Sequence, residues 1–200
     1  MSIAADVIRL RPDISTLPPA LTALLQPVGF VDPELLGHAS RVVPLVSRTI
    51  DCLPGCTEQD RLQSVATALL HDVGKAGIPS GILQKRGPLT STEISIVRGH
   101  AAIGANLVGI VLGDEVLAAT IRHHHEWWNG DGYPAGLAGL RIPLASRVTG
   151  IADAFDAMTT DRPYRAARDV SSALEELRRC AGTQFDPELV QAFISAVSTG

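Results

Sequence analysis

An imidazole and a carboxylate stand side by side at His71 and Asp72, directly after an apolar run that predicts a helix. Both side chain types bind metal ions in proteins. Neighbouring residues on a helix point about 100° apart, so a pair that acts together usually lies at a helix end or reaches two metal ions. Asp72, with its two oxygens, suits a bridge between two metals.

The other histidines allow this idea to be tested within the sequence. They are His38, His100, His123, His124 and His125, which with His71 make six. All six lie in predicted helices rather than in a tail. A lone histidine such as His100, in a helical stripe with Ile96, Ile103 and Leu107, is more often a core residue. Five further histidines in addition to the HD pair instead favour a metal cluster.

Two carboxylates lie where they could complete the cluster. Glu34 precedes His38 by four residues, which places both on one face of a helix expected to begin at Asp32 and Pro33. Asp153 lies on the flank of a predicted amphipathic helix, near the edge of its apolar stripe. An isolated Asp there is more often solvated, but this one can face a site.

At these residues the chain resembles the HD-GYP phosphodiesterases, a branch of the HD-domain metal-dependent phosphohydrolases. An HD pair alone is weakly specific, whereas three segments in the family's order are highly specific, and the resemblance runs from about residue 34 to residue 193. The segments are His71-Asp72-Val73-Gly74-Lys75, then His124-His125-Glu126 with Gly130-Asp131-Gly132-Tyr133-Pro134, and then Asp153 with Asp161-Arg162-Pro163-Tyr164-Arg165.

The resemblance implies an all-α fold, a compact helical HD-domain bundle with a short GYP loop beside the metal site. It implies hydrolysis of cyclic di-GMP to pGpG, and in some members onward to GMP, by attack of a metal-bridging hydroxide. Carried over position by position, the expected metal ligands are Glu34, His38, His71, Asp72, His100, His124, His125 and Asp153.

The number and kind of metal ions follow from these ligands. Members with a Glu at the position of Glu34 resemble a three-metal branch, so two or three divalent ions are expected and three are favoured. A donor set of imidazoles and carboxylates without thiolate favours Fe(II) or Mn(II), with Zn and Ni as alternatives.

The resemblance also implies roles at the substrate. Asp72 and Lys75 are the expected catalytic residues, with the Lys75 ammonium beside a phosphate oxygen that gains charge. The expected substrate-binding residues are Lys75, Tyr133, Arg162 and Arg165. The two arginines could equally form surface ion pairs, and Tyr133 could simply pack the loop onto the helices.

Four residues near the second motif keep open roles. His123 is an extra imidazole outside the family's motif. Asn129 stands where many members carry Asp, which puts a carboxylate role there in doubt. Of Trp127 and Trp128, one is expected to fill the core and the other could line a base pocket.

Length and composition favour one main domain. The 200 residues are 46% hydrophobic and 19% charged, enough to bury a single core. Residues 31–200 are expected to form the HD-GYP domain and residues 1–30 a short helix or adaptor. A net charge of −4 disfavours a nucleic-acid polymer as partner. The three cysteines, Cys52, Cys56 and Cys180, fit a reducing cytoplasm.

Local signals predict where several helices begin. Thr57, Thr90 or Ser91, and Asp186 precede helical patterns as N-cap residues. Pro44 is expected to kink or interrupt the first long helix. The longest apolar stretch, residues 101–112, is expected to be too short to span a bilayer, so no membrane partner is expected.

Three functions remain open at this stage. The first is cyclic di-GMP hydrolysis, and the second is hydrolysis of another cyclic dinucleotide or a nucleotide by the same kind of centre. The third is a non-catalytic protein that binds cyclic di-GMP for signalling. A homodimer, or a diguanylate cyclase or sensor partner, fits any of the three.

Overall fold

The computed structural model of the chain describes residues 19, 23–26, 34–161 and 166–198. These described residues form helices and no β-strand, as the all-α expectation requires. The helices are, in chain order, α3 (Leu35–Asp51), α4 (Glu58–Leu70), η2 (Val73–Gly77), α5 (Ser80–Leu83), α6 (Ser91–Arg98), α7 (His100–Leu112), α8 (Glu115–Arg122), η3 (Gly139–Arg141), α9 (Leu144–Thr159), α10 (Val170–Cys180) and α11 (Pro187–Ser198).

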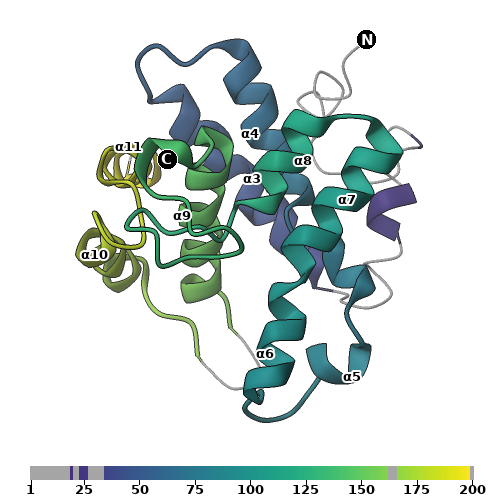
Figure 1. Cartoon of the computed structure of the whole chain (residues 1–200). Coiled ribbons are helices and arrows are strands. Elements are labelled where there is room, and N and C mark those ends of the chain that lie inside the picture. Colours follow the sequence, from purple (N-terminus) through teal and green to yellow (C-terminus); the bar gives the residue numbers. More distant parts are fainter. Residues whose placement is uncertain (1–18, 20–22, 27–33, 162–165, 199–200) are drawn as a thin grey trace.

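Two hydrophobic clusters hold these helices together. The first lies among α3, α9, α10 and α11, where the rings of Phe155 and Phe193 meet edge to face with their centroids 5.1 Å apart. The second joins α4, α7 and α8, and also covers the buried Leu24 and Leu25. In Figure 1, α10 and α11 lie on one side of α9, and α7 and α8 lie on the other.

The helix starts expected from Thr57, Thr90 and Asp186 are confirmed. Thr57 caps α4 and Thr90 caps α6, each with a reciprocal bond to the acidic residue three positions on. Asp186 precedes α11, and its carboxylate accepts the backbone N–H of Glu188 at 2.9 Å. The expected start at Asp32 and Pro33 lies outside the described residues, and α3 is described from Leu35 with Glu34 before it.

Pro44 does not interrupt the first long helix, because α3 runs from Leu35 to Asp51 with Pro44 inside it. The side chain of Pro44 is exposed. The hydrogen bond that a proline removes therefore lies on the solvent side, where water can bond the free carbonyl. The expected interruption is wrong for this reason.

Several histidines expected in helices lie instead just beyond helix ends. His71 is the residue after α4, His123 is the residue after α8, and His124 and His125 follow in a turn. A helix end releases the chain from the 100° rotation per residue, so consecutive side chains can turn toward one centre. The consecutive pairs His71-Asp72 and His124-His125 need this freedom to face one centre.

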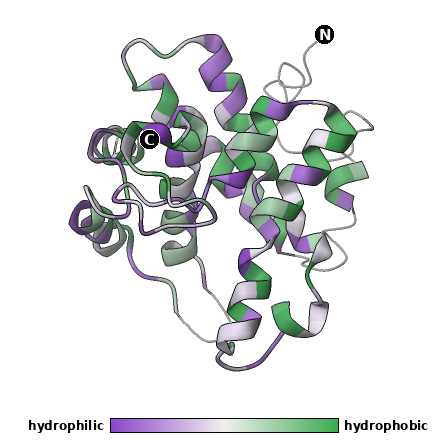
Figure 2. Cartoon of the chain, viewed as in Figure 1, coloured by the Kyte–Doolittle hydropathy of each residue, from purple (hydrophilic) through white to green (hydrophobic). Residues whose placement is uncertain are grey.

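Helices α6 and α7 carry several exposed apolar side chains. Ile94 and Ile96 on α6 are exposed, and Ile110 at the far end of α7 is 82% exposed. Figure 2 shows the hydrophobic colour on the visible side of this helix pair. The apolar stretch of residues 101–112 is part of a longer helical segment, Ser91–Leu112, whose 22 residues are long and apolar enough to cross a membrane. One such helix is weak evidence of a span, and His100 within it is buried in the protein.

Two glycines allow η2 to lie directly on α7. A Cβ at Gly74 would overlap the carbonyl oxygen of His100 and the backbone nitrogen of Gly104, and a Cβ at Gly104 would lie 3.0 Å from the nitrogen of Gly74. The loop that carries the HD pair can therefore approach the helix that carries His100 only because both positions lack side chains.

We predict that Gly74→Ala destabilises the protein by roughly 2–3 kcal/mol, because the added methyl pushes against backbone rather than a flexible side chain. It should also weaken metal binding by moving the HD pair away from His100. Urea unfolding and metal content measure the two effects. Gly81→Ala is the matched control, since a Cβ there meets nothing within 4 Å. An unchanged midpoint and metal content in Gly74→Ala would refute the packing role.

Candidate metal centre

Six of the eight expected ligands form two groups in the interior. The first group consists of His38, His71 and Asp72, and the second of His100, His124 and His125. Within each group, the ligand atoms lie within 4.8 Å of one another. Each group mixes residues from helices far apart in the sequence, so the fold itself assembles them.

Asp72 lies between the two groups. Its Oδ2 is 3.5 Å from His71 Nε2 and 4.0 Å from His38 Nε2, whereas its Oδ1 is 3.4 Å from His100 Nε2. One carboxylate oxygen thus faces each group. This is the arrangement that a carboxylate bridging two metal ions requires.

Three histidine rings are oriented in the same way. Nδ1 of His71, His100 and His124 bonds the backbone carbonyl three residues earlier, at 2.9, 2.8 and 2.6 Å. A carbonyl oxygen can only accept, so Nδ1 carries the proton and the Nε2 lone pair points inward. The tautomer of each ring is therefore set by the helix end that precedes it.

His38 is oriented by a carboxylate instead. Its Nδ1 bonds Asp156 Oδ2 at 2.7 Å, and Asp156 also accepts two bonds from Arg41, at 2.5 and 3.0 Å. On the inner side, His38 Nε2 lies 3.3 Å from Asp153 Oδ1. Asp153 therefore lies beside the first group, and it comes from α9.

Asp156 and Arg41 were missed in the sequence. Asp156 follows Asp153 by three residues and Arg41 follows His38 by three, so both pairs lie one helical turn apart on two helices. This spacing of three residues from an expected ligand was the signal in the sequence that could have identified Asp156 and Arg41. Histidine ligands commonly donate their second ring nitrogen to a carboxylate, which fixes the ring and raises its basicity.

The protonation of the centre differs between its two groups. Burial by itself lowers the pKa of His38, but its bonds to Asp153 and Asp156 raise that pKa to about 9. Burial lowers the pKa of His100 and of His124, and lowers that of His125 to about 4. The three histidines of the second group are therefore neutral imidazoles. In the first group, the carboxylates of Asp153 and Asp156 favour the protonated form of His38.

Asp72 remains ionised at the boundary between the groups. Burial by itself would raise its pKa, but the nearby His71 and Lys75 hold that pKa well below its usual range. The ammonium of Lys75 lies 2.8 Å from Asp72 Oδ2. The Lys75 side chain keeps 24% of its surface exposed, so it lies at the rim of the centre.

This donor set fits divalent metal ions. Nε2 of His38 lies 3.2 Å from Nε2 of His71, and Nε2 of His100 lies 3.3 Å from Nε2 of His124. In the second pair, both nitrogens carry lone pairs because both protons are on Nδ1, and two lone pairs at this distance repel. A cation between them removes the repulsion and also balances the buried carboxylates.

Some predicted site residues lie outside these groups or outside the described residues. Glu34 is exposed, one turn before His38, and is in neither group. His123 bonds Glu126 Oε1 at 3.2 Å, as befits an imidazole outside the ligand set. Arg162 and Arg165 lie outside the described residues.

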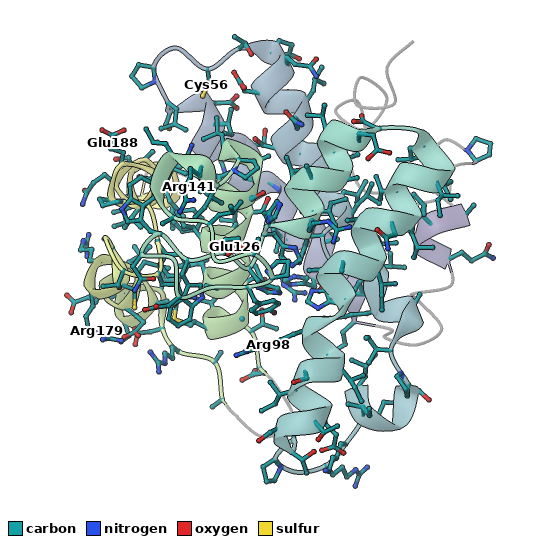
Figure 3. The ribbon with its side chains drawn as sticks, in the orientation of Figure 1. Cys56, Arg98, Glu126, Arg141, Arg179 and Glu188 are labelled. Carbon is teal, nitrogen blue, oxygen red and sulfur yellow. The ribbon has the colours of Figure 1, made fainter. Side chains whose placement is uncertain are left out.

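Glu126 anchors the GYP loop to the second group. Its side chain is fully buried, and its two oxygens accept the backbone N–H groups of Ala135 at 2.7 Å and Leu137 at 3.0 Å. Gly132 lies so close to Glu126 and Trp127 that a Cβ would overlap their backbone. Figure 3 labels Glu126 near the middle of the molecule.

The loop presents Tyr133 to the centre. The Tyr133 ring lies 4.9 Å from the ring of His125, centroid to centroid, and the guanidinium of Arg98 lies 4.9 Å from the Tyr133 ring. Arg98, the last residue of α6, was not singled out in the sequence. Asn129, by contrast, bonds Asp131 within the loop and is exposed.

A cavity of about 170 Å³ adjoins the centre, and His125 and Asp153 are among the residues that line it. Both tryptophans line it. Trp128 is half-buried, and Arg147, which pairs with Asp186, lies 5.8 Å from its ring. Trp127 is exposed. Trp128 is thus the more enclosed of the two rings.

Comparison with known proteins finds a matching family and several similar proteins. Residues 28–189 match the HD domain family. A cyclic di-GMP phosphodiesterase of Thermotoga maritima is 36% identical over 169 residues, which cover 82% of this chain and 45% of that protein. A 3'3'-cGAMP-specific phosphodiesterase of Vibrio cholerae is 35% identical over 181 residues, covering 89% of this chain and 38% of that protein. The chain thus spans less than half the length of these curated relatives.

Solved structures share the fold. The HDG"Y"P protein Bd1817 from Bdellovibrio bacteriovorus superposes with a TM-score of 0.68 at 17% identity, covering 99% of this chain and 68% of that one. A cyclic GMP-AMP-specific phosphodiesterase of Vibrio cholerae gives a TM-score of 0.62 at 24% identity, covering 90% of this chain and 47% of that one.

We predict that Asp156→Asn weakens metal binding by about tenfold, because a neutral amide holds the His38 ring less firmly and lowers its basicity. Competition with a chelator measures the affinity. Asp51→Asn is the matched control, since Asp51 also pairs with an arginine, Arg61, but on the surface. Equal metal affinity in the two variants would show that Asp156 serves stability alone.

Proposed function

The chain belongs to the HD-domain family, and from this we propose that it is a metal-dependent phosphodiesterase that hydrolyses cyclic di-GMP to pGpG, with GMP as the product of any second cut. The observation that carries the proposal is the position of Asp72, with one carboxylate oxygen toward each of two histidine groups. Two adjacent metal positions are the usual basis for in-line hydrolysis of a phosphodiester.

We assign the metal ions to the two groups and Asp153. His38, His71, Asp72 and Asp153 would hold one ion, and Asp72, His100, His124 and His125 the other. When bound, the ions supply Lewis acidity to the phosphate and a water activated for attack. Fe or Mn fits the donors best, with Zn or Ni as alternatives.

The protein's own residues bind and orient the substrate around this centre. Lys75 lies at the rim with its ammonium next to Asp72, where it can contact a phosphate oxygen that gains charge as the bond breaks. Tyr133 forms one wall of the centre against His125. Arg162 and Arg165 stay part of the proposal as contacts to the second phosphate or a guanine edge.

A second candidate substrate is another cyclic dinucleotide. The observation that favours it is that a relative named as 3'3'-cGAMP-specific is about as similar to this chain as one named as a cyclic di-GMP phosphodiesterase. Cyclic di-GMP is preferred because further relatives from Xanthomonas campestris and Pseudomonas aeruginosa carry that name. A cytoplasmic location and a homodimer or sensor partner complete the proposal.

We predict that the protein loaded anaerobically with Fe(II) or Mn(II) converts cyclic di-GMP to pGpG, and that EDTA abolishes the reaction. Chromatography of the products measures it, with 3'3'-cGAMP as the competing substrate.

Asp72→Ala should lose both metal and activity, whereas Lys75→Ala should keep the metal and turn over about 100-fold more slowly. A fully metal-loaded protein that cleaves neither substrate would contradict the proposed function.

We predict that Glu34→Ala lowers the metal-to-protein ratio by one ion, since Glu34 lies one helical turn before His38 and can reach a third position beside the first group. Elemental analysis of the purified protein measures the ratio. Glu58→Ala removes a comparable carboxylate from the first turn of α4 and serves as the control. An unchanged ratio in Glu34→Ala would leave a two-metal centre.

A further inference from the structure

Arg98 lies beside the metal centre without belonging to it. It is the last residue of α6, two positions before His100, and its side chain is exposed. Its guanidinium lies 4.9 Å from the centre of the Tyr133 ring, and the same ring lies 4.9 Å from His125. Tyr133 therefore connects Arg98 to the second group. Figure 3 labels Arg98 between Glu126 and the lower part of α6.

The surroundings of Arg98 differ from those of the other arginines near the centre. Arg41 and Arg147 each form an ion pair with a buried aspartate. In the ranges that the structure describes, no carboxylate lies within 4.0 Å of the Arg98 guanidinium. Its packing on the Tyr133 ring holds the guanidinium plane in place while leaving its N–H donors for another acceptor. A preorganised cation of this kind suits an anion.

The proposed substrate carries an anion that the centre does not neutralise. A cyclic dinucleotide has two phosphodiester groups, and only one at a time can occupy the metal positions beside Lys75. The other remains negatively charged and must lie further out. Arg98 is a cation one ring beyond His125, and a guanidinium can bind two phosphate oxygens at once.

We propose that Arg98 binds the phosphodiester group of the substrate that is not being cleaved, with Tyr133 as the platform that positions the guanidinium. The proposal rests on the proposed function, because it assumes a substrate with two phosphates. It makes Arg98 a determinant of selectivity for cyclic dinucleotides over diesters that carry one phosphate.

The test compares two substrates in metal-loaded protein. Arg98→Ala should raise the KM for cyclic di-GMP about tenfold, equivalent to losing one charge-assisted hydrogen bond, with a much smaller change in kcat. Hydrolysis of bis(p-nitrophenyl) phosphate, which has one phosphate, should stay at the wild-type rate. Arg98→Lys should restore part of the lost affinity, because it keeps the charge but not the planar fork.

Arg141→Ala is the matched control, since Arg141 is also exposed and belongs to η3 on the chain beyond the GYP loop. It should leave both KM values unchanged. A purely structural role of Arg98 would instead lower the thermal midpoint and slow both substrates equally, which would overturn the proposal. So would wild-type KM values in Arg98→Ala.

Failure of the proposed function can be told apart from failure of this inference. If the wild-type protein binds cyclic di-GMP without cleaving it, the phosphodiesterase assignment fails. Calorimetric titration of cyclic di-GMP into wild type, Arg98→Ala and Arg141→Ala then decides the inference by itself. A weaker Kd in Arg98→Ala alone supports it, and equal Kd values refute it.

Discussion

The balance of charge and lone pairs at the centre is the constraint on which the rest of the structure depends. Asp72 is ionised and buried, and the neutral rings of His100 and His124 turn their Nε2 lone pairs toward each other at 3.3 Å. Such an interior is unfavourable unless positive charge is placed within it. We therefore regard metal binding and the packing of α4, α7 and α9 as coupled events, in which the ions stabilise the contacts that build their own site.

Helix ends supply the ligands in a way that also serves the helices. The last carbonyls of a helix have no partner within it, and the rings of His71 and His124 donate their Nδ1–H to the carbonyls of Ala68 and Ile121. One hydrogen bond thus satisfies a helix terminus and aims a ligand inward. This explains why the motif histidines follow α4 and α8 rather than lying within them.

The motifs predicted the helical class and the residues of the two histidine groups, because residue identity and order along the chain are sequence properties, whereas the roles of these residues as metal ligands stay predictions. They could not predict His38 with Asp156, whose contact joins residues 118 positions apart and depends on how α3 packs on α9. The exposure of Ile96 was missed for a related reason, since its helical stripe shows that a face is apolar but not whether another element covers that face. The expectation that Pro44 interrupts the helix was wrong, because a proline on the solvent side of a helix leaves its free carbonyl open to water.

The GYP loop and the metal centre form one unit, because the tripeptide His124-His125-Glu126 contributes residues to both. His124 and His125 face the centre while the next residue, Glu126, holds the loop through two backbone N–H groups. Relatives named for different cyclic dinucleotides resemble this chain about equally, so overall similarity does not distinguish those substrates. The residues placed by the loop, Tyr133 and through it Arg98, belong to neither ligand group. Selectivity is therefore best sought at the rim of the centre, where side chains can change without disturbing the charge balance inside.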